Sequence, residues 1–148
     1  MNKKKLYDAC LNLLKEKISI AKQGMAEAQA SANNETKSSA GDKYETGRAM
    51  SQRERDLHAR QLAELINMQK AFSAIDPDKT CLKVELGALV QTSTSMFFIA
   101  SSLGAVTVDK KQIMVISAIS PIAQTMLNKK VGDRFKWISN EVEILSIS

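Results

Sequence analysis

The spacing of apolar residues changes once along the chain, near residue 76. Before that point apolar side chains recur every three or four residues, which predicts helices. After it they fall in short runs bounded by turn residues, which predicts strands. The pattern therefore predicts two domains, a helical one at residues 1–76 and a sheet-containing one at residues 77–148.

The first helix is predicted over residues 4–32, because its apolar residues alternate spacings of four and three in a heptad seam. The large residues of this seam come first and the small ones last, so a partner helix must approach most closely toward the far end. Gly24 is the one residue in this range that disfavours a helix. The seam consists of Tyr7, Leu11, Leu14, Ile18, Ala21, Met25, Ala28 and Ala32.

A polar run over residues 31–42 is rich in turn and N-cap residues and predicts a reversal with its tip near 33–43. A second helix is predicted over residues 43–75. Because neither helix can bury its apolar stripe alone, we expect an antiparallel coiled-coil hairpin. A compact bundle is the alternative, but the sequence predicts no third long helix. The stripe of the second helix is Met50, Leu57, Leu65, Met68, Phe72 and Ile75.

Pro77 ends the helical region, because a proline disfavours a helical conformation at the residue before it. Six strand-like runs follow, with a short helix starting near Pro121. We therefore expect an α+β chain whose second domain is a small antiparallel β-sheet with one helix on it. The predicted strands are residues 88–91, 96–100, 105–108, 113–116, 134–137 and 142–147.

The composition fits a folded globular chain, with 44% hydrophobic and 25% charged residues. The net charge of +5 favours an anionic partner, but no basic and aromatic motif predicts direct reading of nucleic acid. One His and two Cys are too few for a structural zinc site. We expect a cytoplasmic protein without a membrane span, in which Cys10 and Cys81 are reduced thiols.

No residue set predicts catalysis by the chain alone. His58 has no partner at metal-ligand spacing, and no phosphate loop or nucleophile motif is present. Near the tip, the carboxylates of Glu35, Asp42 and Glu45 could coordinate Mg²⁺ if a second protein supplied further ligands. The alternative is that these acids only cap helix ends, and periodicity alone favours it.

The segment 117–135 resembles the C-terminal signature of the bacterial Gre family of transcription elongation factors. It contains Ser-Pro-Ile-Ala at 120–123, then an apolar helix, then Asn-Lys-Lys-Val-Gly-Asp at 128–133. Asn128 stands where the family usually has Gly. The resemblance implies an FKBP-like C-terminal domain after the coiled-coil hairpin.

The resemblance also implies a function. The family docks at the secondary channel of RNA polymerase, and Ser120, Pro121 and Ile122 would lie in the docking loop. The hairpin would enter the channel, where tip acids share a catalytic Mg²⁺ with the polymerase and stimulate cleavage of backtracked transcripts. The polymerase would be the enzyme, and nucleic acid would be met only inside that complex. We expect the chain itself to be a monomer.

The tip motif of the family, an Asp followed three residues later by a Glu, fits in two ways. One registration uses Glu35 and Ser38, and the other uses Asp42 and Glu45. With Ser38 in the second position, Mg²⁺ recruitment should weaken, and the protein would occupy the channel without stimulating cleavage. Two other classes stay open: an FKBP-type prolyl isomerase, disfavoured by the few aromatic residues, and a coiled-coil adaptor.

Overall fold

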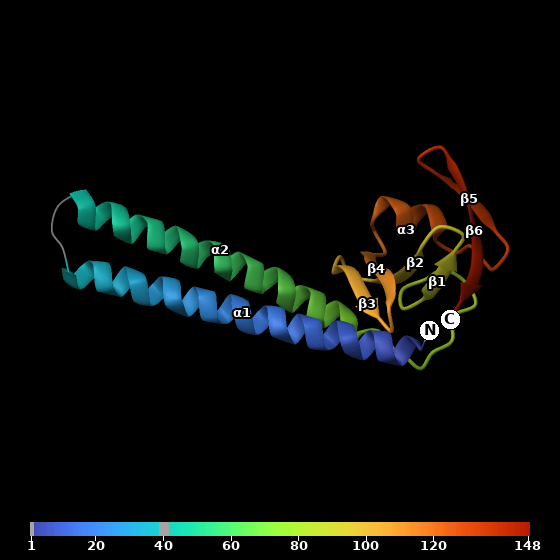
Figure 1. The fold of residues 1–148 in the computed structure, drawn as a ribbon, viewed down its shortest axis with the longest axis horizontal. Helices are drawn as coiled ribbons and strands as arrows, with labels where there is room; N and C mark the ends of the chain where they lie inside the picture. Colours follow the sequence, from blue (N-terminus) through green and yellow to red (C-terminus); the bar gives the residue numbers. More distant parts are fainter. Residues whose placement is uncertain (1, 39–41) are drawn as a thin grey trace. The chain divides into compact units, whose positions relative to one another are not determined.

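The computed structural model describes residues 2–38 and 42–148, with side chains described for 2–33 and 46–148. Two long helices are followed by a six-stranded sheet and one short helix (Figure 1), which confirms the predicted α+β fold. The elements are α1 (Lys3–Ser38), α2 (Asp42–Ser73), β1 (Leu89–Thr92), β2 (Met96–Ala100), β3 (Gly104–Val108), β4 (Lys111–Ser117), α3 (Pro121–Met126), β5 (Arg134–Trp137) and β6 (Asn140–Ile147).

The chain divides into two compact units, and both long helices contribute to each. The base unit contains Met1–Asn12 and Met68–Ser148, and the arm unit contains Leu13–Asn67. The base unit therefore includes the sheet together with the first turns of α1 and the last turns of α2.

In the arm unit, α1 and α2 run side by side in opposite directions (Figure 1). The predicted seam of α1 faces inward, since Leu14, Ile18 and the three alanines of the seam are buried. The helix continues past its predicted end at residue 32 to Ser38. Polar residues that usually favour turns can therefore extend a helix, because the preceding turns are already formed and packed.

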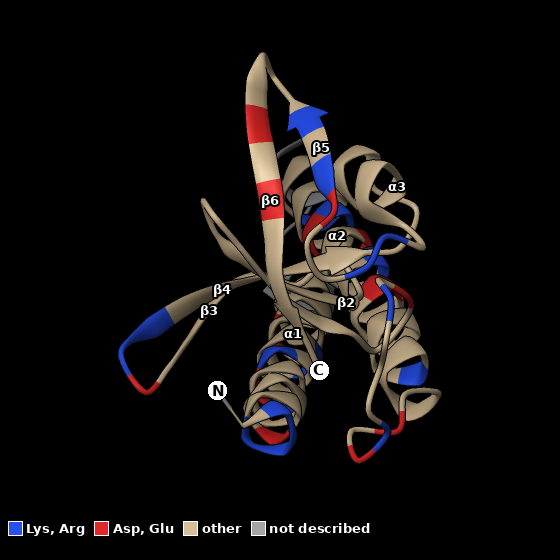
Figure 2. Ribbon diagram, turned by 90° about the vertical axis from the view of Figure 1, so that its right-hand side faces the viewer, with Lys and Arg blue, Asp and Glu red and all other residues tan. Residues whose placement is uncertain are grey.

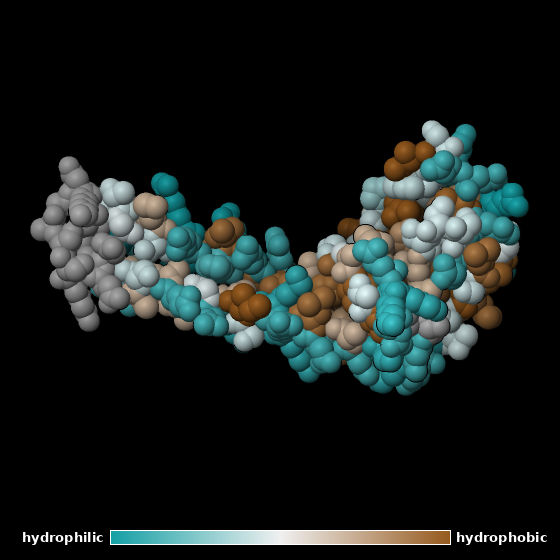
Figure 3. All heavy atoms as spheres, in the orientation of Figure 1, coloured by the Kyte–Doolittle hydropathy of each residue, from teal (hydrophilic) through white to brown (hydrophobic). Residues whose placement is uncertain are grey.

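The predicted stripe of α2 is wrong at Met50 and Leu57, whereas Leu65 lies on the inward face as predicted. Met50 is 58% exposed and Leu57 is 47% exposed, whereas Arg55 and His58 are partly buried. In Figure 3 hydrophilic atoms cover most of the visible arm, with single hydrophobic residues between them. The partly buried positions repeat at spacings of four and three, as a heptad requires, and many are polar. They are Ser51, Arg55, His58, Leu62, Leu65 and Gln69, followed by the buried Phe72.

The sheet has the order β3-β4-β2-β1-β6-β5. Its pairings are antiparallel as predicted, except that β2 and β4 pair in parallel. The exception arises because β3 and β4 form a hairpin whose second strand lies against β2. In Figure 2, Lys and Arg on β5 face Asp and Glu on β6. Arg134 on β5 lies 3.9 Å from both Glu141 and Glu143 on β6.

Both faces of the sheet are covered within the base unit. On one face, Ala123 and Met126 of α3 pack into a core with Phe97, Ile99 and Ile144. Strand residues that alternate with these point to the opposite face, since successive side chains of a strand do so. Phe98 is one of them.

The second face meets the two long helices. The ring of Phe72 on α2 lies 6.1 Å from that of Phe98 and 6.0 Å from that of Tyr7 on α1. The Tyr7 hydroxyl donates to the carbonyl of Phe72 at 2.8 Å. The roots of the hairpin are therefore part of the core of the sheet unit.

Candidate functional site

The turn that opens α3 is rigid because Ser120 caps the helix. Ser120 has an extended backbone, and its hydroxyl accepts from the backbone N–H of Ala123 at 3.4 Å. The same hydroxyl donates to the carbonyl of Ser117 at 2.7 Å. Pro121 occupies the first helical position, where a missing N–H costs nothing. Further along, the side chain of Gln124 donates back to the carbonyl of Ala118 at 2.7 Å.

The three residues of this turn that the sequence singled out differ in their surroundings. Pro121 is exposed, Ser120 is half-buried and engaged in capping, and Ile122 packs against the core under α3. Directly before them, Ile119 is 83% exposed. The turn therefore presents an apolar edge of Ile119 and Pro121 on a fixed backbone.

The predicted tip carboxylates of Glu35, Asp42 and Glu45 lie outside the residues whose side chains the structure describes. Along the backbone, Glu35 falls in α1, and Asp42 and Glu45 fall in the first turn of α2. Among the described side chains, no group of three or more His, Cys, Asp or Glu is placed to hold a metal ion.

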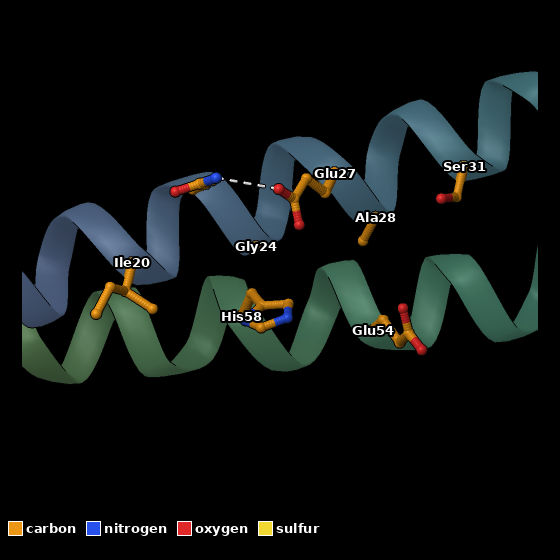
Figure 4. Close-up of a pocket in the computed structure, with 8 residues that line it drawn as sticks. Ile20, Gly24, Glu27, Ala28, Ser31, Glu54 and His58 are labelled. Atoms are coloured by element: carbon orange, nitrogen blue, oxygen red, sulfur yellow. Dashed lines mark hydrogen bonds between the residues drawn. The ribbon is translucent and has the colours of Figure 1, made fainter.

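In the arm, His58 lies between the two helices against Gly24 (Figure 4). A Cβ added to Gly24 would come within 2.6 Å of Cε1 of the imidazole. Nδ1 of His58 is buried and has no hydrogen-bond partner among the described atoms. Ser31, Glu27 and Glu54 help to line a shallow groove beside the ring. The position of His58 between the helices explains why α2 contains a histidine that has no partner at metal-ligand spacing.

Arg55 is a second polar residue of the seam, and it forms a hydrogen bond to the opposite helix. The guanidinium of Arg55 donates to Oε1 of Gln29 at 3.0 Å and also contacts the carboxylate of Asp56 at 2.9 Å. Hydrogen bonding lets a charged residue occupy an inward position that the sequence predicted for apolar ones. The polar character of this seam could not be inferred from apolar spacing.

In the base unit, the ammonium of Lys3 is an anchor that the sequence analysis missed. Lys3 is 8% exposed, and its Nζ donates to the carbonyls of Lys79 at 2.5 Å and Gly87 at 3.1 Å. Its Nζ also lies 3.9 Å from Sγ of Cys81. These contacts fasten the start of α1 to the connection between α2 and β1. Only the register of Lys3 with the buried Leu6, Tyr7 and Cys10 signals an inward position.

Both cysteines are free and buried. Burial raises the pKa of the Cys10 thiol from 9.0 to about 11. Burial also raises the pKa of Cys81, although the charge of Lys3 opposes the shift. Nearby, a hydrogen bond from Lys79 lowers the pKa of Glu85, and the two side chains lie 3.2 Å apart. Neither thiol has the depressed pKa of a reactive cysteine.

Residues 83–148 match the family model described as "Transcription elongation factor, GreA/GreB, C-term". The C-terminal domain belongs to the GreA/GreB family. The match includes all six strands and α3, together with the Ser120–Pro121 turn. It confirms the predicted resemblance and the FKBP-like architecture of this domain.

The part of the chain that follows the helical hairpin is thus similar to the C-terminal domain of GreA/GreB transcription elongation factors. No curated protein matches the chain as a relative. Across residues 2–38 and 42–148, no helix is both long and apolar enough to cross a membrane.

Proposed function

We propose that this Gre-like factor binds RNA polymerase at the secondary channel through the turn at Ser120, Pro121 and Ile122. The observation that carries the proposal is the GreA/GreB domain, in which a capped turn exposes Pro121 beside the protruding Ile119. A preorganised apolar edge loses little conformational entropy on binding. It is therefore suited to anchor the domain on a protein surface.

We further propose that the tip of the hairpin acts inside the channel. Glu35, Asp42 and Glu45 are the acids that flank the end of α1 and the start of α2. Carboxylates are ligands that Mg²⁺ prefers, so these residues would supply ligands to a Mg²⁺ shared with the polymerase. That ion would activate water for hydrolysis of the transcript, and the chain's own part would be to position acidic ligands.

Occupation of the channel without cleavage is the second candidate, because Ser38 takes the place of one acid in one registration of the tip. A cleavage assay on a backtracked elongation complex separates the two. The parent chain is compared with Glu35→Ala, Asp42→Ala and Glu45→Ala, and with Glu54→Ala as a control acid elsewhere on α2. Loss of stimulation in a tip variant, with Glu54→Ala active, supports assisted cleavage.

Stimulation that survives all three tip changes excludes the carboxylates from the reaction. If the parent binds but gives no stimulation, the chain occupies the channel only. Docking is tested separately by the affinity of Pro121→Ala for core polymerase, with Ile138→Ala as a control because Ile138 is also an exposed apolar residue of the domain. Equal affinities of the two variants would exclude the turn as the anchor.

A further inference from the structure

A second apolar surface of the base unit lies at the other end of α3. Leu82 is 81% exposed and Val131 is 57% exposed. Their segments are joined by hydrogen bonds from the N–H of Val84 to the carbonyl of Lys129 at 2.9 Å and from the N–H of Asn128 to the carbonyl of Val84 at 2.8 Å. We name Leu82, Lys83, Lys129, Lys130 and Val131 the Leu82–Val131 surface.

The backbone under this surface is fixed. Val84 and Met126 are fully buried in the core on the α3 side of the sheet. The N–H of Gly132 donates to the carbonyl of Ile144 at 2.8 Å, and the N–H of Lys130 donates to the carboxylate of Asp133 at 2.8 Å. The exposed Leu and Val are therefore held in place by a packed core, and a partner would not have to order this segment.

The charge of the Leu82–Val131 surface is positive. None of its three lysines forms a salt bridge with a described residue, and two of them, Lys83 and Lys130, are exposed. The nearby acids offset this charge only in part, because Glu85 forms its salt bridge with Lys79 and acts on Lys83 through its charge alone, while Asp133 accepts from the backbone. Two aliphatic side chains among unpaired lysines are complementary to an acidic protein surface with an apolar patch. Nucleic acid fits less well, since no residue of the surface is aromatic.

We propose that the Leu82–Val131 surface is a second contact with RNA polymerase, made to an acidic and partly apolar region of that enzyme. This inference rests on the proposed docking of the Ser120–Pro121 turn. The two surfaces adjoin opposite ends of α3, whose six residues span about 9 Å. A partner seated on the turn is therefore close enough to reach both.

The test measures the affinity of the full chain for core RNA polymerase at low and high salt. Leu82→Ser/Val131→Ser should weaken binding about tenfold at both salt concentrations, because apolar contact is lost. Lys83→Glu/Lys130→Glu should weaken binding by a similar factor at low salt and by less at high salt, because salt screens exposed charges. Thermal unfolding of each variant verifies that the exposed changes leave the fold intact.

Matched controls lie elsewhere in the same domain. Ile138→Ser removes a side chain that is 78% exposed on the β5–β6 turn, and Lys110→Glu/Lys111→Glu makes the same change in net charge at the β3–β4 turn. Weaker binding by the surface variants, with both controls unchanged, supports the proposal. If the surface variants bind like the parent while Pro121→Ala binds weakly, the second contact is refuted and the docking turn stands. If the parent itself does not bind, both proposals fail.

Discussion

Gly24 provides the space that His58 occupies in the arm, because a side chain at this position would overlap the imidazole. Glycine in a helix costs about 1 kcal/mol relative to alanine, so its presence in α1 needs a local reason. The close approach of the ring is that reason. The two residues should therefore behave as a coupled pair.

Gly24→Ala is expected to destabilise the arm by about 1–2 kcal/mol, since the overlap with His58 outweighs the gain in helix propensity. In a His58→Ala background the same change should stabilise the arm by about 1 kcal/mol, because only the gain in propensity is left. Urea unfolding followed by circular dichroism measures both values. The same sign in the two backgrounds would contradict the coupling.

Cys10 makes the stability of the base unit depend on pH in the alkaline range. Its pKa is about 11 in the folded chain and 9.0 ordinarily, so the unfolded chain loses the thiol proton first. The stabilisation is complete below pH 9.0 and is lost as pH rises through about 11. Cys10→Ala should therefore show a smaller fall in the free energy of unfolding across this window, measured by denaturant titration. Equal falls in the two proteins would contradict the assigned burial of the thiol.

At the scale of elements, the start of α1 depends on one buried ammonium group. Lys3→Met is expected to cost about 2–3 kcal/mol, because the carbonyls of Lys79 and Gly87 lose a charged donor. Lys4→Met is the matched control, since Lys4 is exposed. Lys5→Met should cost less than about 1 kcal/mol, because the ion pair of Lys5 with Asp109 is exposed. Equal unfolding midpoints for all three variants would show that Lys3 is not an anchor.

Local side-chain chemistry determined which elements the sequence could predict. The seam of α1 followed from apolar spacing, and the start of α3 near Pro121 followed from the tolerance of proline at the first helical position. The inward face of α2 did not, because Arg55 is hydrogen-bonded to Gln29 and the ring of His58 is accommodated by the space over Gly24. Such compensation joins two distant segments and leaves no periodic signal on either one.

The sequence predicted where strands lie, but it did not predict which strands pair with each other. Short strand-like runs bounded by turn residues predicted β2 and β5 at their observed bounds. The parallel pairing of β2 with β4 depends on where the β3–β4 hairpin inserts, and alternation within a strand carries no information on its neighbours. The burial of Lys3 was likewise hidden, since a lysine is ordinarily exposed.

At the scale of the whole molecule, the sheet is not an independent C-terminal piece. Leu6, Tyr7, Cys10, Phe72 and Ile75 are buried, and all lie before residue 77 but within the base unit. A fragment of residues 77–148 would lack these residues, and the face of the sheet that carries Phe98 would lose its cover. The fold of the GreA/GreB domain therefore depends on the roots of the helical hairpin.

The fragment 77–148 is expected to bind a hydrophobic dye and to unfold at a lower urea concentration than the full chain. The matched control is a chain in which a short linker replaces residues 13–67, because it keeps every segment of the base unit. This control should unfold like the base of the full chain. Equal midpoints for the fragment and the control would contradict the structural role of the hairpin roots.

The small and polar residues of the arm's seam favour local opening of the helix pair. Ala21, Ala28 and Ala32 on α1 face a stripe of α2 that includes Ser51, Arg55 and His58, so the arm buries little apolar area per turn. Segments with few buried apolar contacts open at lower free energy than a packed core. Backbone amides around His58 should therefore exchange with deuterated solvent well before those of β1 and β2, and the helix pair should separate transiently while the sheet stays closed.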